Sequence, residues 1–186
     1  NFETDEDLSG WNTWDANSDD YTWGISAASG IDGTQAAGYG FNSAGSADDW
    51  LITRCFDLEA GKRYAISFYY AVESASYPEK VKLCYGQQAE PAGMTTVIRD
   101  LGAMTNVNYL RSSDTIDIAA TGTWYFGWHA YSDADMWNLY IDSVKIEEVV
   151  AEPLDVDFTA DVVSGVVPLT VSFTDKSGSR SASWSW

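Results

Sequence analysis

The chain has 186 residues, and its hydrophobic content of 45% is enough to build a packed core and argues against disorder. Its 28 acidic residues outnumber the 10 basic ones, which gives a formal net charge of -18. A surface this negative repels phosphate backbones and anionic headgroups, so we expect no binding to nucleic acid. No stretch reaches the roughly 20 apolar residues that cross a bilayer, so we also expect no membrane insertion.

Alternation of apolar and polar residues dominates the first 149 residues, and helical periodicity is nearly absent. The segments with this pattern, each expected to form a strand, are 50–56, 63–72, 80–85, 123–128 and 137–146. Connectors rich in Gly, Ser and Asp separate them. In the segment 123–128, alternation places Trp124, Phe126 and Trp128 on one face, which we expect to be core. Strands at this spacing without intervening helices predict an all-β sandwich or barrel.

The composition changes near residues 149–153, where the sequence becomes rich in Val, Ser and Thr. We therefore expect one domain over 1–149, a linker over 150–153 and a second domain over 154–186. The strands expected in the second domain are 156–160, 169–175 and 181–186. A full sandwich of this type needs about seven strands, so the second domain is expected to be incomplete as given.

The most specific candidate site is the acidic segment that contains Asp15, Asn17, Asp19 and Asp20. Oxygen-bearing side chains at alternating positions can curl around one Ca²⁺, as in the first half of an EF-hand loop. The glycine and the final glutamate of an EF-hand are missing, so the remaining ligands must come from elsewhere. The alternative is an Asx-rich turn without metal, in which each side chain bonds to nearby backbone.

Two further acidic pairs leave alternatives open. Asp133 and Asp135 either bind a second Ca²⁺ or solvate the tip of a loop. Asp48 and Asp49 precede an expected strand, and Asp49 either holds a turn or joins a cation shell. The abundance of carboxylates makes close pairs inevitable, so the pairs alone do not identify the catalytic acids of a glycosidase.

The residues that nucleophilic catalysis needs are scarce. His129 is the only histidine, and we expect it to be a partly buried residue of a sheet rather than a base. No Gly-x-Ser-x-Gly motif occurs, and a single histidine with two distant cysteines does not suit zinc. We therefore expect no enzyme. Cys55 and Cys84 lie in different expected strands and either form one disulfide or remain two thiols.

Aromatic residues make up 15% of the chain, with 9 Trp and 11 Tyr, which suits a sheet surface or a ligand platform. The aromatics that lie near expected loops are Trp11, Trp14, Trp23, Tyr77 and Trp137. An exposed ring at such a position can stack on a sugar or contact a protein. The alternative is that these rings pack beneath the loops.

Several motifs occur in an order that carries a resemblance. They are WNTWDANSDDYTW at 11–23, ADDWLIT at 47–53, SASYPEK at 74–80 and TWYFGWHAYSDADMWNLYIDSVKI at 123–146. Together they resemble the cleaved-adhesin, or choice-of-anchor J, domain family of gingipain haemagglutinin regions and other large secreted bacterial proteins. The resemblance covers roughly residues 1–149 and implies a jelly-roll β-sandwich, similar to MAM and carbohydrate-binding domains, with calcium in its loops.

The same resemblance suggests further calcium ligands and a second family. In jelly-roll modules of this kind, acidic residues on the first and last strands complete the calcium site, and Glu3 and Asp142 occupy matching positions. After the linker, the motif GVVPLTVSFTD and the final SWSW are similar to the start of a PKD domain. Such a domain implies a partial immunoglobulin-like sandwich that serves as a spacer.

These observations predict a non-catalytic, calcium-stabilised adhesin or binding module of a secreted or cell-surface multidomain protein. Its expected partner is a protein or glycan of a host or neighbouring cell. Two alternatives stay open: a carbohydrate-binding module of a secreted hydrolase, and a structural repeat of a surface stalk or filament. A solvent-exposed row of aromatic rings would favour the carbohydrate-binding alternative.

Overall fold

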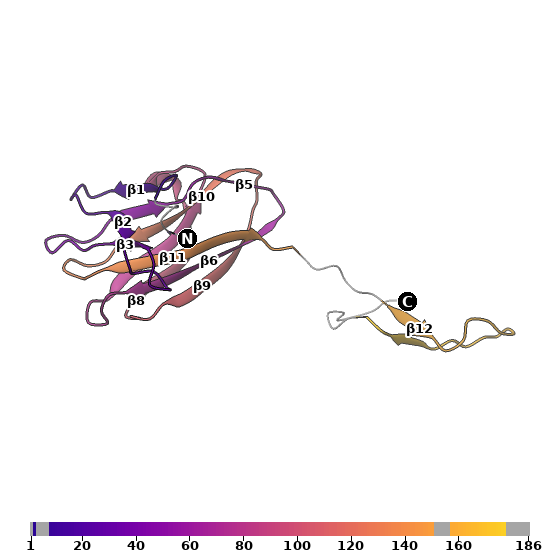
Figure 1. Ribbon diagram of the computed structural model, residues 1–186. Helices are drawn as coiled ribbons and strands as arrows, with labels where there is room; N and C mark the ends of the chain where they lie inside the picture. The colour runs from indigo at the N-terminus through magenta and orange to yellow at the C-terminus, as the bar shows by residue number, and fades with distance from the viewer. Residues whose placement is uncertain (1, 3–7, 151–156, 178–186) are drawn as a thin grey trace. The chain divides into compact units, whose positions relative to one another are not determined.

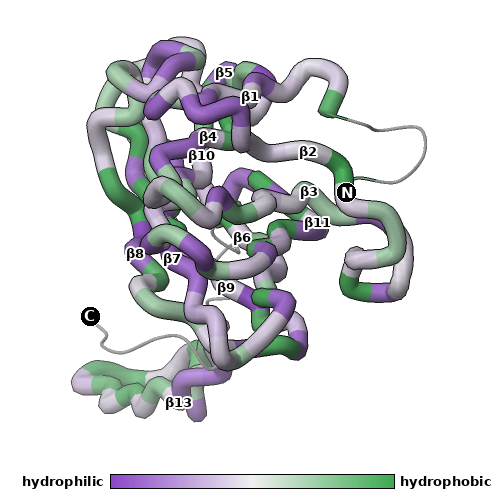
Figure 2. Tube along the Cα trace, turned by 90° about the vertical axis from the view of Figure 1, so that its left-hand side faces the viewer, coloured by the Kyte–Doolittle hydropathy of each residue, from purple (hydrophilic) through white to green (hydrophobic). Residues whose placement is uncertain are grey.

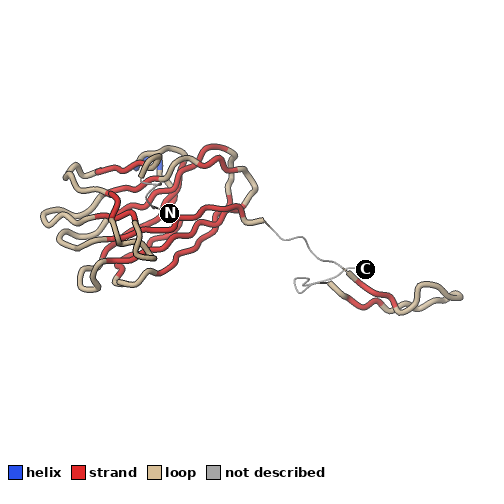
Figure 3. Tube along the Cα trace, viewed as in Figure 1, coloured by secondary structure: helices blue, strands red, loops and turns tan. Residues whose placement is uncertain are grey.

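A computed structural model of the chain describes residues 2, 8–150 and 157–177, and it divides the chain into two compact units, Asn1–Val149 and Val150–Trp186. In the first unit, two antiparallel sheets pack face to face (Figures 1 and 3). A short 3₁₀ turn, η1 (Pro91–Gly93), is the one helical segment among the described residues, and none of their helices could span a membrane. The all-β sandwich predicted from the alternation is confirmed.

Each sheet has its own set of strands. The first has the order β1 (Asn12–Asp15), β4 (Asp49–Ile52), β10 (Gly122–Ala130), β7 (Glu79–Gly86) and β8 (Thr96–Met104), with β5 (Phe56–Leu58) also pairing with β10. The second has the order β2 (Trp23–Ser26), β3 (Ala36–Tyr39), β11 (Leu139–Glu148), β6 (Arg63–Val72) and β9 (Leu110–Asp117). The chain passes between the sheets from β1 to β2, β3 to β4, β5 to β6, β6 to β7, β8 to β9, β9 to β10 and β10 to β11. These crossings interleave the two layers and bring distant segments together at each end.

The expected strands form with small differences. The segment 63–72 forms β6 with the predicted bounds, whereas 50–56 covers most of β4 and only the first residue of the separate strand β5. The strands that the sequence did not predict are β1, β2, β3, β8 and β9. The first three of these have four residues each, which is too few to show a clear alternation.

The core between the sheets is rich in aromatic rings. Trp128 is fully buried, and its ring centroid lies 5.3 Å from that of Phe68 in the facing sheet and 6.0 Å from that of Trp11. Phe126 is buried beside it and Trp124 packs against the same cluster, as the alternation predicted. Along the trace in Figure 2, hydrophobic and hydrophilic positions interchange. Such alternation is typical of strands that direct one face into the interior of a sandwich.

The second unit contains a short hairpin among its described residues. Strand β12 (Phe158–Ala160) pairs with β13 (Phe173–Asp175), within the expected strands 156–160 and 169–175. The third strand expected there, 181–186, lies outside the described residues. The assignment of this unit to the PKD family stays a prediction.

Both cysteines are free thiols, which settles the alternative that the sequence left open. Cys55 is exposed, whereas Cys84 is buried on the outer side of the first sheet in a small cluster with Trp50, Ile52 and Met94. Burial raises the pKa of the Cys84 thiol to about 11, so this group is both covered and protonated at neutral pH.

We predict that a thiol reagent modifies Cys55 rapidly in the native protein and reaches Cys84 only after unfolding. Ellman's reagent should therefore report one thiol without denaturant and two in guanidinium chloride. No thiol in denaturant, in the absence of reductant, would contradict the free-cysteine structure.

Candidate functional site

Loops that join the two sheets gather at one end of the sandwich, on the left in Figure 1. We call this region the loop end and define it as residues 15–22, 40–48, 73–80 and 131–138. Backbone hydrogen bonds tie these loops to one another or to neighbouring strands: Ala16 N–H to Asp48 O, 3.0 Å; Ala47 N–H to Ser132 O, 2.9 Å; Asp135 N–H to Asn42 O, 3.0 Å; and Glu73 N–H to Asn138 O, 2.8 Å. The loop end is therefore a connected surface rather than a set of independent loops.

Within the acidic segment, the Asp15 carboxylate holds the turn together. Its Oδ1 accepts a hydrogen bond from the backbone N–H of Asp19 at 3.1 Å, and its Oδ2 accepts one from Asp20 N–H at 2.8 Å. Asp20 has a φ of 67°, in the left-handed region that Asp tolerates better than most residues. These bonds are those of an Asx-rich turn, the metal-free alternative that the sequence allowed.

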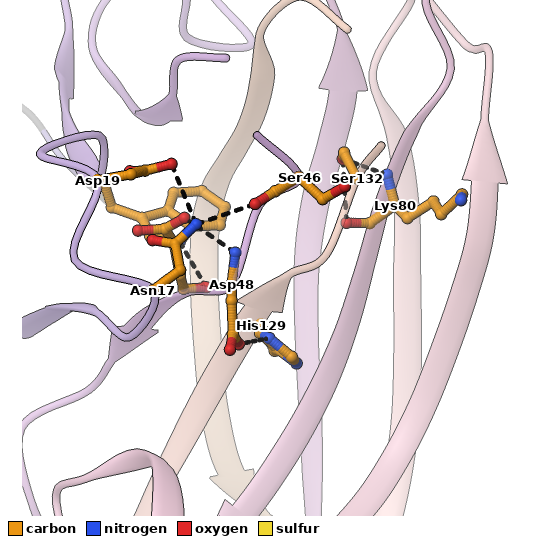
Figure 4. Close-up of polar contacts among 9 residues, drawn as sticks. Asn17, Asp19, Ser46, Asp48, Lys80, His129 and Ser132 are labelled. Atoms are coloured by element: carbon orange, nitrogen blue, oxygen red, sulfur yellow. Dashed lines mark hydrogen bonds and ion pairs between the residues drawn. The ribbon is translucent and has the colours of Figure 1, made fainter. Parts of the chain in front are cut away.

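Two amide side chains converge on Asp19 (Figure 4). Its Oδ2 accepts hydrogen bonds from Asn17 Nδ2 at 3.0 Å and from Asn42 Nδ2 at 2.8 Å, and Asn17 Nδ2 also donates to Ser46 O at 2.9 Å. Burial would raise the pKa of Asp19, but the hydrogen bonds from Asn42, Tyr21 N–H and Asn17 outweigh it and lower the pKa. Asp19 therefore stays ionised, as a carboxylate that binds a cation must.

Asp142 lies apart from this segment. It is 1% exposed in β11, where its Oδ2 accepts a hydrogen bond from Ile31 N–H at 2.9 Å and its Oδ1 accepts one from Ser143 N–H. The described contacts of Asp142 are thus with the 27–35 loop and not with residues 15–20. Glu3, the other ligand expected from an end strand, lies outside the described residues, so the expected ligand set is not brought together as one group.

The second acidic pair is also divided. Asp133 forms an ion pair with Lys80, with 2.6 Å between Oδ2 and Nζ, while Asp135 is exposed with a φ of 60°. Across the described part of the chain, no group of three or more His, Cys, Asp or Glu side chains is arranged to hold a metal ion. A calcium ion at the loop end would thus depend on amide and backbone oxygens and on water for part of its shell.

Two carboxyl groups at the rim of the first sheet point into the protein interior. Asp49 lies two residues before the buried Leu51 and Glu79 two residues before the buried Val81, so all four side chains face the core. Both carboxyl groups are fully buried, and Asp49 Oδ1 and Glu79 Oε1 have no hydrogen-bond partner in the described structure. Burial raises the pKa of each to about 7.

Sequence reasoning missed Glu79, although the signal was present. The strand expected over 80–85 alternates with Val81 and Leu83 on its inner face, and extending it by one residue places Glu79 on that face. There Glu79 Oε2 accepts a hydrogen bond from the Ser132 hydroxyl, while Ser132 Oγ accepts one from Lys80 N–H at 2.8 Å.

On the outer face of the same sheet, one row of side chains crosses the neighbouring strands. The register pairs Trp14 with Trp50, Trp50 with His129, His129 with Lys82 and Lys82 with Asp100. The rings of Trp50 and His129 are stacked, with centroids 4.2 Å apart and planes inclined by 4°. We call these five residues the cross-strand row.

Most polar groups of the cross-strand row are already engaged, although His129 Nδ1 is buried without a hydrogen-bond partner among the described residues. His129 Nε2 lies 2.6 Å from Asp48 Oδ1 (Figure 4), and burial lowers the pKa of the imidazole although Asp48 opposes the shift. Tyr131 donates a hydrogen bond to Asp100 at 2.5 Å, and Lys82 Nζ lies 5.2 Å from the Tyr131 ring centroid. The side chain of His129 is 12% exposed, so the expectation of a partly buried sheet residue is confirmed.

The loop end also carries an aromatic pocket of about 230 Å³. Its lining residues are Phe41, Tyr77, Asp135, Met136 and Trp137. Tyr77 and Trp137 meet edge to face, with centroids 5.6 Å apart and planes inclined by 76°, and they are 39% and 42% exposed. We call this cavity the aromatic pocket.

The five aromatics that the sequence offered as ligand contacts divide into two groups. Trp14, like Tyr77 and Trp137, is exposed, at 41%. Trp23 instead is 3% exposed, with its Nε1 donating to Asp49 O at 3.3 Å, and Trp11 packs against the core beside Trp128. Trp23 is therefore too buried to contact a ligand, because its ring fills the core between the sheets, whereas Trp11 is only partly buried and its ligand contact stays a prediction.

Comparison of the sequence with protein-family models and with curated proteins gives no match. Comparison of the structure gives several. A cleaved adhesin domain of Lys-gingipain from Porphyromonas gingivalis matches with a TM-score of 0.63 and 18% identity, covering 75% of this chain and 90% of that one. Another cleaved adhesin domain of the same protein matches with a TM-score of 0.61 and 16% identity, covering 75% and 94%.

A carbohydrate-binding domain has the same architecture. The CBM22-2 xylan-binding domain from Paenibacillus barcinonensis matches with a TM-score of 0.57 and 13% identity, covering 80% of this chain and 96% of that one. At these identities the matches show the fold alone. The fold expected from the motifs is thus the observed one, and the choice of ligand has to be argued from the residues of this chain.

The buried carboxyl of Glu79 should make stability depend on pH. Its pKa in the folded state is about 7 against an ordinary value of 4.5, so between these values the folded protein binds more protons than the unfolded chain. The free energy of unfolding should therefore fall as the pH rises from 4.5 to 7. Glu79→Gln removes this slope, so in a chelating buffer the wild type should lose roughly 1–3 kcal/mol relative to the variant.

Urea unfolding at several pH values measures this difference. Glu147→Gln is the matched control, because Glu147 is an exposed residue paired with Lys145 on the surface. Its stability should run parallel to that of the wild type. A constant difference between the wild type and Glu79→Gln across the window would show that Glu79 does not titrate as a buried group.

Proposed function

We propose that this chain carries a non-catalytic binding module of a secreted or cell-surface multidomain protein, and that the module engages its partner through the loop end. The observation that carries the proposal is the aromatic pocket, because Tyr77 and Trp137 hold about 40% of their surface in solvent on loops that are tied to one another. A rigid, exposed aromatic pair is typical of a recognition surface.

The described surroundings of the one histidine do not favour nucleophilic catalysis. The only histidine, His129, is stacked on Trp50 and bound to Asp48, with no hydroxyl or thiol nucleophile among its described hydrogen-bond partners. The similar solved structures are adhesin and xylan-binding domains, and by analogy of fold they favour binding over catalysis.

We also propose that Ca²⁺ stabilises the loop end. Asp15 and Asp19 present carboxylate oxygens there, and Asp49 Oδ1 is buried without a donor. Each carboxylate oxygen has two lone pairs, so both oxygens of Asp15 and Asp19 Oδ1, which accept one hydrogen bond each, keep a site for a cation, whereas Asp19 Oδ2 already accepts two bonds. Coulombic repulsion from Asp19 and Asp15 adds to burial in raising the pKa of Asp49, and a divalent cation would offset both effects.

The oxygen-bearing side chains at the loop end are of the kind that calcium prefers, although no three carboxylates of the described residues are already grouped to hold an ion. Ca²⁺ takes about six to eight oxygen ligands in a flexible shell, so Asp15, Asp19 and Asp49 would have to draw together on binding, with Asn17, carbonyl groups and water completing the shell. Asp142, with Glu3 as the expected partner from the first strand, is a candidate for a separate ion beside the 27–35 loop. Magnesium fits less well, because it requires a tighter octahedral shell.

We predict that chelation lowers the melting temperature of the protein and that Asp15→Ala reproduces the loss without chelator. Binding to the folded state alone adds about 2.7 kcal/mol when free calcium is a hundredfold above the dissociation constant. Asp57→Ala is the control, because Asp57 lies in β5 and bonds to Thr123; it should retain the full calcium-dependent shift. Identical unfolding in calcium and in chelator, on protein shown to be metal-free, would contradict the calcium proposal.

The cross-strand row supports carbohydrate binding as a second candidate function. It places the exposed ring of Trp14 beside Trp50, His129 and Lys82 on the outer face of the sheet, but Trp50 is only 7% exposed, so the row presents a single exposed ring rather than the solvent-exposed row of rings named in the sequence analysis. Aromatic faces next to polar groups suit the apolar and hydroxyl faces of a sugar ring. One of the similar structures is a xylan-binding domain.

Variants at the two surfaces distinguish these functions. In affinity electrophoresis with soluble xylan, carbohydrate binding by the row predicts that the wild type is retarded, that Trp14→Ala is not, and that Trp137→Ala behaves as the wild type. If Trp137→Ala lost the retardation and Trp14→Ala kept it, glycan binding would be placed at the loop end instead. No retardation of the wild type would leave xylan without support as its ligand.

A further inference from the structure

The size of the aromatic pocket limits what it can hold. At about 230 Å³ it is smaller than the roughly 300–1,000 Å³ of pockets that enclose a small-molecule ligand. Three of its lining residues are aromatic, and the fourth, Met136, has an adaptable thioether. These dimensions fit the end of one side chain that enters from a partner rather than a cofactor or an oligosaccharide.

Asp135 gives the pocket its charge. Of the described residues that line the pocket, it is the one charged member, and its carboxylate forms no hydrogen bond or ion pair with any residue that the structure describes. The neighbouring Asp133 is already neutralised by Lys80 at 2.6 Å. The negative charge of Asp135 is therefore left for a group that enters the pocket.

The residues around the pocket also favour a cationic group. The four segments of the loop end contain eight acidic residues (Asp15, Asp19, Asp20, Asp48, Glu73, Glu79, Asp133 and Asp135) and one basic residue, Lys80. Across the chain the formal net charge is -18. An anionic group would be repelled from this surface, whereas a cationic one would be attracted before contact is made.

Aromatic faces and a free carboxylate together recognise a cation. The face of a tryptophan or tyrosine ring carries negative potential that attracts an ammonium or guanidinium group within about 6 Å of the ring centre. The methylenes of a long basic side chain pack on the same rings. A neutral sugar ring instead needs several converging donors and acceptors, whereas Asp135 is the one charged side chain among the described lining residues and the Tyr77 hydroxyl and Trp137 indole N–H are the other polar side-chain groups.

We propose that the aromatic pocket receives a single lysine or arginine side chain of a protein partner, packed against the exposed rings of Tyr77 and Trp137 and paired with Asp135. This inference rests on the proposed binding function of the loop end and specifies the chemistry of the partner. It makes charge, rather than apolar shape alone, the feature that the pocket selects.

Four short capped peptides test the proposal on the full chain. They have the form acetyl-Gly-X-Gly-amide, where X is arginine, citrulline, lysine or norleucine, so that each basic residue has a neutral partner of similar shape. The readout is the indole N–H resonance of Trp137 in ¹⁵N-labelled protein, assigned by its loss in Trp137→Phe. The arginine and lysine peptides should shift this resonance and bind at least about threefold more tightly than citrulline and norleucine.

Variants of the protein show which residue causes the preference for the basic peptides. Asp135→Asn keeps the size of the side chain and tolerates the φ of 60°, and it should reduce the preference for the basic peptides to about twofold or less. Asp57→Asn, at an exposed carboxylate of β5, is the matched control and should leave all four affinities unchanged. The indole and methyl spectra of each variant show whether it is folded.

Every outcome decides the matter. Equal affinity of the basic and neutral peptides would overturn the proposal and leave the loop end as an apolar recognition surface, so the proposed function would stand without it. No shift of the Trp137 resonance with any peptide, or a shift by methyl glucoside stronger than that by the arginine peptide, would also overturn it. A charge preference that survives in Asp135→Asn would exclude Asp135 as the recognising group.

Discussion

Alternation of side chains across the pleat of the first sheet is the constraint on which the rest of the structure depends. It directs Leu51, Val81 and Trp128 into the core, and with the same period it directs Asp49 and Glu79 inward at the rim. A buried carboxyl group is costly unless it is neutralised or bonded. The loops that cover this rim accordingly contribute polar donors to these carboxyl groups, such as the Ser132 hydroxyl to Glu79 and the Asp48 N–H to Asp49, as well as the apolar rings of the aromatic pocket.

The sequence was sufficient for the layers of the sandwich but not for the composition of the site. Long alternating runs such as 63–72 predict a strand with the right bounds, because each added residue repeats the period, whereas four-residue strands such as β1 carry too little pattern. The acidic segment was recognised from residue types alone. Its separation from Asp142, and the burial of Trp23, depend on which sheet each strand joins, and local alternation does not contain that information.

Two surfaces of the module present aromatic rings, and they differ in what they leave free. In the cross-strand row, the polar groups of His129, Lys82 and Asp100 already interact with neighbouring residues. In the aromatic pocket, the Asp135 carboxylate has no partner among the described residues, and the rings are exposed at the tips of connected loops. The similarity to adhesin and xylan-binding domains fits both surfaces, because it concerns the shared sandwich. The difference in unsatisfied charge favours the loop end as the binding surface.

The central claim is that the connected loops of the loop end form one recognition surface that a cation makes rigid. Amide hydrogen exchange, followed residue by residue with and without calcium, tests it most directly, because exchange reports local opening of each loop. The account predicts slower exchange in calcium at the Asp19, Asp20 and Asp135 amides, with strands such as β6 unchanged. Equal exchange at these amides in calcium and in chelator, or slowing spread evenly over the whole sandwich, would contradict it.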